Sequence, residues 1–196
     1  IYHTWICEVM SQQTTLAVVL PKFAEFIQQL PTVDALAKCD EEKLHQLWAG
    51  LGYYARARNL KKGADFIVNR LNGRFPQSYR EWLQIPGCGE YTAAAIASIC
   101  LNEKVACIDG NVIRVVSRLL ALQDVWSVAG RSCIQDYLTQ IVPSDRPGDF
   151  NQAMMELGAT ICRKAKPLCD LCPLQRQCLA FARNCIEACP PKKPRY

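Results

Sequence analysis

Residues 83–93 read Leu-Gln-Ile-Pro-Gly-Cys-Gly-Glu-Tyr-Thr-Ala, and this stretch decides the fold. We expect an apolar helix to end at Pro86, the glycines Gly87 and Gly89 to form a tight turn, and a second helix to follow at once. A helix N-terminus beside a glycine turn offers backbone N–H groups to an anion, which predicts a phosphate-binding hairpin. A plain helix–helix turn is the alternative for a lone Gly-x-Gly, and the flanking Pro, Thr and Ala make the pattern more specific.

Helical spacing of apolar residues continues on both sides of this hairpin, and strand alternation is hard to find. The spacing predicts helices over 4–20, 22–30, 41–48, 54–71, 78–84, 90–101, 111–122, 131–141 and 149–162. Breaks in the pattern fall at Pro21, Pro31, 72–73, 86–87 and 143–148. Asp34 and Asp40 are placed to cap two of the helices. We therefore expect an all-α fold.

Length and composition limit the class of protein. The chain has 196 residues, of which 50% are hydrophobic and 21% are charged, so it can bury a core and is not disordered throughout. No apolar run approaches the roughly 20 residues that span a bilayer, and no secretory signal is present, so we expect no membrane partner. Because the chain starts inside a patterned segment, we expect a fragment of a longer protein.

We expect two helical lobes. The first is a helical bundle over residues 1–105 that contains the helix-hairpin-helix at 83–96. The second covers residues 106–185, and a linker-like tail rich in Pro and Lys follows at 186–196.

Basic residues gather at two places. Residues 159–196 carry a net charge of +6, whereas residues 1–158 carry −1. The second place is a run without acidic residues that contains Arg56, Arg58, Lys61 and Lys62. Two basic patches suggest a polyanionic partner, and charge alone leaves ordinary solvated surface open as the alternative.

The twelve cysteines fall into two groups. Six are scattered, often beside apolar residues, as is typical of small core residues: Cys7, Cys39, Cys88, Cys100, Cys107 and Cys133. The other six crowd the C-terminus, and four of them have the spacing Cys162-x6-Cys169-x2-Cys172-x5-Cys178. Four thiolates at such spacing can hold a cubane iron–sulfur cluster. The pairs Cys169/Cys172 and Cys185/Cys189 leave a zinc site open as the alternative.

The loop between the first two of these four cysteines is basic. It contains Arg163, Lys164 and Lys166. A metal core would hold this loop rigid, and we expect it to contact phosphates. Such contacts supply affinity and position but do not read base sequence.

Further segments, together with the hairpin and the cysteines, resemble the helix-hairpin-helix DNA glycosylases with an iron–sulfur cluster. Residues 7–14 read Cys-Glu-Val-Met-Ser-Gln-Gln-Thr, which resembles the Ser-Glu-Val-Met-Leu-Gln-Gln-Thr motif of adenine DNA glycosylases. Residues 47–56 and 149–159 look like that family too, and the resemblance covers about residues 1 to 182. It implies a four-iron four-sulfur cluster on the four cysteines and double-stranded DNA in a cleft between the lobes.

The resemblance also implies an enzyme that hydrolyses the N-glycosidic bond of adenine mispaired with 8-oxoguanine or guanine. This chemistry needs an acid for the departing base and a carboxylate near the cationic sugar. Glu8 matches the family's catalytic acid, which protonates adenine at N7, and Asp109 matches the carboxylate. An apolar pocket keeps such an acid protonated. The residues alone leave Glu8 as a helix-surface residue and Asp109 as an N-cap.

Tyr91 distinguishes related enzymes. Bifunctional relatives that resemble endonuclease III carry at this position a lysine that attacks the sugar and leads to strand cleavage. A tyrosine cannot form a Schiff base, so we expect base removal without efficient strand cleavage. By resemblance, Tyr91 lies in the active site and helps to orient catalytic groups.

The resemblance places a set of residues on the DNA. A base must leave the duplex before an enzyme can act on it, and the gap must be filled. Family positions that wedge into the helix or contact the opposite base correspond to Gln13, Thr14, Leu51 and Tyr53. Contacts to phosphates are expected from Arg56, from the hairpin glycines Gly87 and Gly89, and from the basic loop.

This chain departs from the family pattern at Ser11, where an apolar residue usually lines the base pocket. We also expect a segment before Ile1 and a C-terminal domain of the family to be missing, and with them part of the discrimination of 8-oxoguanine. Two alternatives stay open, a thymine or uracil mismatch glycosylase and a non-catalytic iron–sulfur DNA-binding module. We expect a monomer inside the cell, in the cytoplasm or nucleoid of a bacterium or in the nucleus or mitochondrion of a eukaryote.

Overall fold

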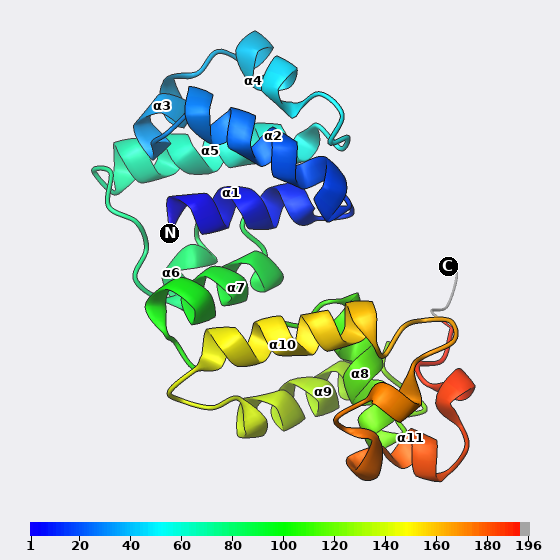
Figure 1. The fold of residues 1–196 in the computed structure, drawn as a ribbon. Coiled ribbons are helices and arrows are strands. Elements are labelled where there is room, and N and C mark those ends of the chain that lie inside the picture. Colours follow the sequence, from blue (N-terminus) through cyan, green and yellow to red (C-terminus); the bar gives the residue numbers. More distant parts are fainter. Residues whose placement is uncertain (193–196) are drawn as a thin grey trace. The chain divides into compact units, whose positions relative to one another are not determined.

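The computed structural model describes residues 1–192, and residues 193–196 of the expected tail lie outside the described part. The described residues form helices, turns and loops without a strand, so the all-α prediction is confirmed (Figure 1). Two compact units divide the chain, Ile1–Glu103 and Lys104–Tyr196. None of the helices in the described part combines the length and apolar composition that crossing a bilayer requires.

Unit 1 is a bundle built around its first helix. Its helices are α1 (Tyr2–Ser11), α2 (Leu16–Gln29), α3 (Val33–Lys38), α4 (Glu41–Trp48), α5 (Ala55–Arg70), α6 (Tyr79–Trp82) and α7 (Glu90–Leu101). Helix α1 packs against α2, α5 and α7 (Figure 1). The rings of Trp5 and Trp82 meet edge to face at 5.6 Å in the core. Both side chains are fully buried, which anchors α1 between its neighbours.

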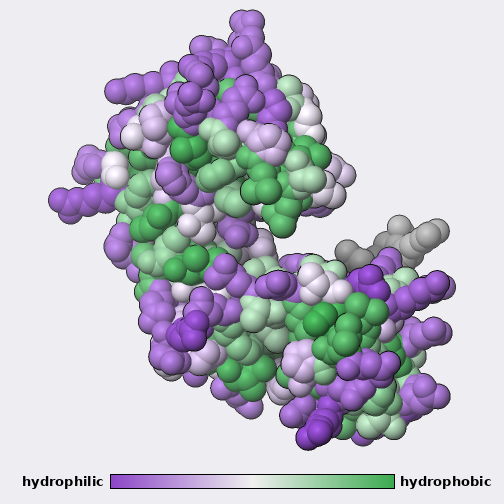
Figure 2. Space-filling model, viewed as in Figure 1, coloured by the Kyte–Doolittle hydropathy of each residue, from purple (hydrophilic) through white to green (hydrophobic). Residues whose placement is uncertain are grey.

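Helix α4 illustrates how sequence pattern sets the outer surface. Leu44 and Trp48 are fully buried, whereas Glu41, Glu42 and Lys43 are exposed. Figure 2 shows hydrophilic residues gathered over α3 and α4 accordingly. The amphipathic stripe therefore fixes which side of this helix faces the core.

The predicted first helix, 4–20, was wrong because the chain forms two helices there. Helix α1 ends before Gln13, whose φ of 56° lies in the left-handed region and stops the helix. Pro21 was expected to break the pattern but lies inside α2. It removes the N–H that would bond the Ala17 carbonyl, and both residues are exposed, so water can take that place.

One predicted cap was confirmed and one was wrong. Asp40 caps α4, since its Oδ1 accepts from the Lys43 N–H at 2.7 Å. The cap of α3 is Thr32, whose Oγ1 accepts from the Ala35 N–H at 3.1 Å, and Asp34 lies in the first turn instead. A hydroxyl and a carboxylate two residues apart are both good caps, so the pattern alone did not decide between them.

Unit 2 is organised around α8 (Gly110–Leu120), which packs against α10 (Pro147–Thr160) and α11 (Leu179–Ala182). Helix α9 (Val128–Ile141) completes the core, in which Val116, Ile134 and Leu138 are buried. Short 3-10 turns at Cys169–Leu171, Gln175–Gln177 and Ile186–Ala188 wrap the C-terminal part. The last of these turns falls in the segment that the sequence suggested was a linker-like tail.

Gly158 lies where α10 closely approaches Asn111 of α8. A Cβ atom there would lie 2.6 Å from the Cβ of Asn111 and 3.1 Å from its backbone. Backbone atoms cannot give way as a flexible side chain can, so α10 needs a glycine at this position.

We predict that Gly158→Val lowers the free energy of unfolding by at least about 2 kcal/mol, because the two helices must separate. Ala159→Val places the same side chain on the exposed neighbouring residue of α10 and should cost less than about 1 kcal/mol. Urea unfolding followed by far-UV circular dichroism measures both. A loss in Gly158→Val no larger than that in Ala159→Val would show that the contact with Asn111 does not govern this position.

Candidate active site

Two predicted site residues of unit 1 touch one another. Glu8 lies on α1 and Tyr91 at the start of α7, and the Tyr91 hydroxyl donates to Glu8 Oε2 at 2.9 Å. One turn further along α1, Gln12 Nε2 donates to the Thr92 hydroxyl at 3.1 Å. These bonds join the C-terminal half of α1 to the second helix of the hairpin. Gln12 was not among the predicted site residues, although it lies one turn after Glu8 on the same face.

The hairpin has the tight turn that its glycines predict. Gly87 has a φ of 79°, and a Cβ atom there would lie 2.5 Å from the Cβ of Asn59. The Cys88 N–H donates to the Ile85 carbonyl at 3.0 Å and closes the turn. Helix α7 then begins with Gly89 as its N-cap and has no side-chain cap. Its first N–H groups and the positive end of its dipole therefore lie beside the glycine turn.

The predicted wedge residues lie on two segments, 12–15 and 50–54, which we call the wedge segments. Each contains a non-glycine residue in the left-handed region, Gln13 with φ 56° and Tyr53 with φ 46°. Both are exposed, and Tyr53 has an exposed fraction of 64%. Leu51, in contrast, is buried with an exposed fraction of 4%. The Thr14 hydroxyl lies 3.3 Å from the Leu51 carbonyl and links the two segments.

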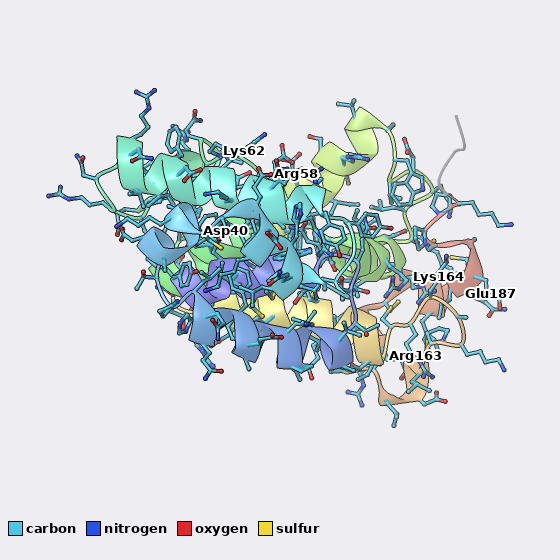
Figure 3. All side chains as sticks on the ribbon, turned by 90° about the horizontal axis from the view of Figure 1, so that it is seen from above. Asp40, Arg58, Lys62, Arg163, Lys164 and Glu187 are labelled. Carbon is cyan, nitrogen blue, oxygen red and sulfur yellow. The ribbon has the colours of Figure 1, made fainter. Side chains whose placement is uncertain are left out.

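Arg56 differs from the prediction. Its terminal guanidinium nitrogens donate to oxygen atoms of the protein rather than lying free for a phosphate. The next basic side chains on the same helix, Arg58 and Lys62, are exposed and one turn apart (Figure 3). The basic run of the sequence therefore divides between an inward and an outward face of α5.

Asp109 begins unit 2's central helix. Its Oδ1 accepts from the Val112 N–H at 2.7 Å, and its Oδ2 accepts from the Asn111 side chain at 2.8 Å. The preceding segment is held by the buried Asn151, which accepts from the Cys107 N–H at 3.0 Å and donates to the Val105 carbonyl at 2.8 Å. The N-cap interpretation is thus correct for Asp109. The same bonds fix the direction of its carboxylate, which a catalytic role also needs.

The four cysteines of the predicted cluster line one cavity of unit 2: Cys162, Cys169, Cys172 and Cys178. The pKa of the Cys169 thiol is raised by burial and then by the charges of the other three sulfurs. To lose their protons together, four thiols around one cavity would require a compensating positive charge. The donor set and its apolar surroundings therefore fit a metal centre.

Two arginines of α8 hold the first of these cysteines. Arg118 is buried, and its Nη1 lies 3.3 Å from Cys162 Sγ. Arg114 donates from Nε to the Cys162 carbonyl at 2.8 Å and from Nη2 to the Gly158 carbonyl at 2.6 Å. Sequence analysis missed both residues. The available signal was two basic side chains one turn apart in the otherwise apolar helix 111–122.

Arg118 binds the backbone of the basic loop that follows Cys162. Arg118 donates from Nη1 to the Arg163 carbonyl at 2.7 Å, and its Nη2 lies 3.3 Å from the Lys164 carbonyl. The side chains of Arg163 and Lys164 are exposed (Figure 3). Lys166 is exposed as well. One buried guanidinium thus fixes the backbone of a loop whose own cations face solvent.

Cys185 and Cys189 are placed apart from the four. Cys189 is buried against Ala121 and Ala180, with Cys185 packed beside them, and neither lines the cavity of the other four. No three Cys, His, Asp or Glu side chains in residues 1–192 gather closely enough to hold a single metal ion. A zinc ion needs all of its sulfurs at about 2.3 Å. Residues 1–192 therefore contain no preformed site for a single zinc ion.

Comparison with known proteins identifies the family. The model for the HhH-GPD superfamily base excision DNA repair protein matches residues 6–128. The chain belongs to this superfamily. The resemblance drawn from the sequence is thereby confirmed.

Several curated relatives of this chain are adenine DNA glycosylases. The chain is 45% identical to that of Rattus norvegicus over 93% of its own length and 36% of the relative's. It is 38% identical to that of Buchnera aphidicola subsp. Baizongia pistaciae, over 93% of this chain and 52% of that one. The chain therefore spans about a third to a half of the length of these relatives.

Solved structures give the same fold. A thermostable thymine-DNA glycosylase superposes with a TM-score of 0.86 at 26% identity, over 93% of this chain and 84% of that one. A non-covalent endonuclease III–DNA complex superposes with a TM-score of 0.79 at 25% identity, over 92% and 84% of the two chains. The all-α fold of this chain is therefore shared with a thymine-DNA glycosylase and with an endonuclease III.

The cap geometry of Asp109 gives a prediction about stability. Asp109→Ala should lower the free energy of unfolding by about 1 kcal/mol, because the Val112 N–H loses its acceptor. Asp109→Asn keeps a capping oxygen and should change stability by a few tenths of a kcal/mol at most. Urea unfolding measures both. A large loss for the asparagine variant would show that the negative charge, and not the cap, stabilises this helix.

Proposed function

We propose that this chain is the catalytic part of a DNA glycosylase that removes adenine mispaired with 8-oxoguanine or guanine. The observation that carries the proposal is the 2.9 Å bond between the Tyr91 hydroxyl and Glu8 Oε2. It joins a carboxyl on the helix of the Glu-Val-Met-Ser-Gln-Gln motif to the hairpin that is common to the superfamily. The adenine DNA glycosylases among the curated relatives support the choice of base.

In the proposed reaction, Glu8 donates its proton to N7 of the extruded adenine. The C1′–N9 bond breaks, and its electron pair leaves with the base. The negative Asp109 stabilises the positive charge that develops on the sugar. Water then adds to C1′, and the proton that it loses restores the Glu8 carboxyl. The fixed direction of Asp109, set by Val112 and Asn111, reduces the reorganisation that this stabilisation would cost.

Tyr91 serves as a positioning residue in this scheme. Its hydroxyl donates to Oε2 of Glu8 and thereby helps to fix the direction of the carboxyl group that transfers the proton. A tyrosine offers no amine for a Schiff base with the sugar. We therefore propose base removal without efficient strand cleavage. We also propose that the enzyme is intracellular and acts as a monomer.

Double-stranded DNA is the proposed partner, with three sets of contacts. The uncapped N-terminus of α7 beside Gly87 and Gly89 supports one phosphate site. The exposed cations of the basic loop support a second. Exposed Gln13 and Tyr53 support insertion into the duplex where the base has left. The cleft expected between the two lobes stays a prediction.

We propose that Cys162, Cys169, Cys172 and Cys178 hold one four-iron four-sulfur cluster. The shared cavity, the mutual charge effect on Cys169 and the Arg118 contact to Cys162 support it. The cluster would supply a rigid positive centre that ties the C-terminal turns to α8, and base removal passes through none of its atoms. Its role in this scheme is structural, because it fixes the loop that meets phosphates.

A thymine mismatch glycosylase is the second candidate function. The similarity to a thermostable thymine-DNA glycosylase, with a TM-score of 0.86, favours it. Ser11 is also consistent with a changed base pocket, since it replaces the apolar residue that the adenine enzymes usually carry. The higher identity to adenine DNA glycosylases outweighs both observations.

We predict that Glu8→Gln lowers single-turnover excision of adenine opposite 8-oxoguanine by about 10²–10⁴-fold and leaves duplex affinity within about twofold. The amide cannot donate the proton but fills the same space. Glu25→Gln is the matched control on the exposed side of α2. Each sample is split and treated with or without hot alkali, and a thymine–guanine duplex is run in parallel.

The wild-type chain should give cleaved strand only after alkali, because it leaves an abasic site. Cleavage without alkali would contradict the meaning given to Tyr91. Equal loss of excision and affinity in Glu8→Gln would remove Glu8 from the chemistry. Excision of thymine in place of adenine would select the second candidate.

The cluster proposal predicts that the purified chain contains about four iron and four sulfide per molecule, with visible absorbance. Cys172→Ser should lose most of that absorbance, whereas Cys133→Ser, at an exposed cysteine of α9, should keep it. Elemental analysis of both variants measures this. Stoichiometric zinc without sulfide would establish the alternative metal.

A further inference from the structure

The C-terminal end of helix α1 has no basic side chain from the helix itself to bind its last carbonyl groups. Its last turn contains no basic residue, although the final carbonyl groups of a helix lack partners and carry partial negative charge. Arg56 of α5 supplies the missing partner. Its Nη1 donates to the carbonyls of Val9 at 2.8 Å, Met10 at 3.0 Å and Gln12 at 2.6 Å.

The other terminal nitrogen of the same guanidinium reaches the second wedge segment. Its Nη2 donates to the Leu51 carbonyl at 2.8 Å and lies 3.3 Å from the Gly52 carbonyl. It also lies 3.2 Å from the Thr14 hydroxyl, in the first wedge segment. The planar fork of one arginine therefore bridges two segments that are almost forty residues apart in the sequence.

Aromatic rings complete the surroundings of this cation. The guanidinium carbon lies 5.5 Å from the centre of the Trp48 ring and 5.7 Å from that of Tyr53. Burial lowers the pKa of Arg56, and the oxygen acceptors and ring faces compensate for the lost water. Tyr53 is otherwise largely exposed, so Arg56 supports the residue expected to enter the duplex.

The backbone at both wedge segments needs such support. Gln13 and Tyr53 hold left-handed conformations that non-glycine residues rarely adopt, and each is exposed. Conformations of this kind persist only where surrounding contacts fix them. The carbonyls that Arg56 binds at Gln12 and Gly52 directly precede these two residues.

We propose that Arg56 is a positioning residue that locks both wedge segments to the end of the helix that carries Glu8. It thereby couples the filling of the duplex gap to the placement of the acid. The catalytic consequence rests on the proposed function, whereas the mechanical lock does not. The proposal replaces the phosphate contact that the sequence suggested for this arginine.

Lysine substitution separates geometry from charge. Arg56→Lys keeps a cation but offers one nitrogen, which cannot reach both segments and stack between two rings. Arg70→Lys is the matched control, since Arg70 is exposed near the end of the same helix. We expect Arg56→Lys to lower the single-turnover excision rate at least about tenfold. We expect extrusion of a fluorescent adenine analogue to fall with it, while Arg70→Lys changes neither.

Hydrogen exchange tests the lock without any activity. In Arg56→Lys, amides of 12–15 and 50–54 should exchange faster together, while those of α6 and α7 keep their wild-type protection. Circular dichroism confirms that the variant is folded. Added ethylguanidinium should restore slow exchange in Arg56→Ala, and ethylammonium at equal concentration should not. If this variant does not fold, the Arg56→Lys exchange pattern decides alone.

Salt dependence distinguishes the lock from a phosphate contact. Loss of one phosphate contact reduces the slope of log affinity against log salt by about one. We expect Arg56→Gln to leave the slope on undamaged duplex unchanged. A reduced slope together with unchanged exchange at both segments would overturn the proposal. If the wild-type chain excises no base but the exchange pattern holds, the proposed function fails and the lock stands.

Discussion

The open end of helix α1 is the constraint on which the candidate site of unit 1 depends. Glu8 lies one turn before that end, and the chain leaves the helix through Gln13 in a left-handed conformation. The carbonyls there need donors that the helix lacks. Arg56 satisfies them from one side, while Gln12 and Tyr91 tie the same helix to the hairpin from another. The acid is therefore positioned by bonds to two other helices, and not by its own helix alone.

Unit 2 also contains an arginine whose guanidinium binds several backbone carbonyls of a loop. Arg118 is buried and donates to carbonyls of the loop after α10, while the cations of that loop face solvent. In each unit a guanidinium with several acceptors fixes a loop whose side chains are proposed to meet DNA. Arginine suits this task better than lysine, because its planar fork can hold several oxygens in fixed directions.

Local chemistry made most of the longer helices, the Asp40 cap and the Gly87 turn predictable from sequence. The cysteine spacing made the four sulfurs of the cavity predictable. The short helices α3 and α11 were not predicted. The break at Gln13 was missed because the polar residues 11–15 include neither Gly nor Pro, the residues that most clearly mark the end of a helix. Thr32 and Asp34 are both suitable caps, so only the structure separated them. The partners of Arg56 and Arg118 could not be predicted, because most of their acceptors are carbonyls of distant segments and a carbonyl carries no residue identity.

Net charge alone does not tell which cations are free to bind a polyanion. In the basic run of α5, Lys61 donates to the Ala37 carbonyl and Arg56 is bonded inward, whereas Arg58 and Lys62 are exposed. Helical period explains the division, because residues 58 and 62 share a face. For the proposed glycosylase, the outward-facing cations supply affinity for phosphates, and a duplex of any sequence offers these. The inward-facing Arg56 instead fixes the wedge segments relative to Glu8. Its contribution to catalysis therefore arises only when a base leaves the DNA duplex. Recognition of a mispair must act at that step.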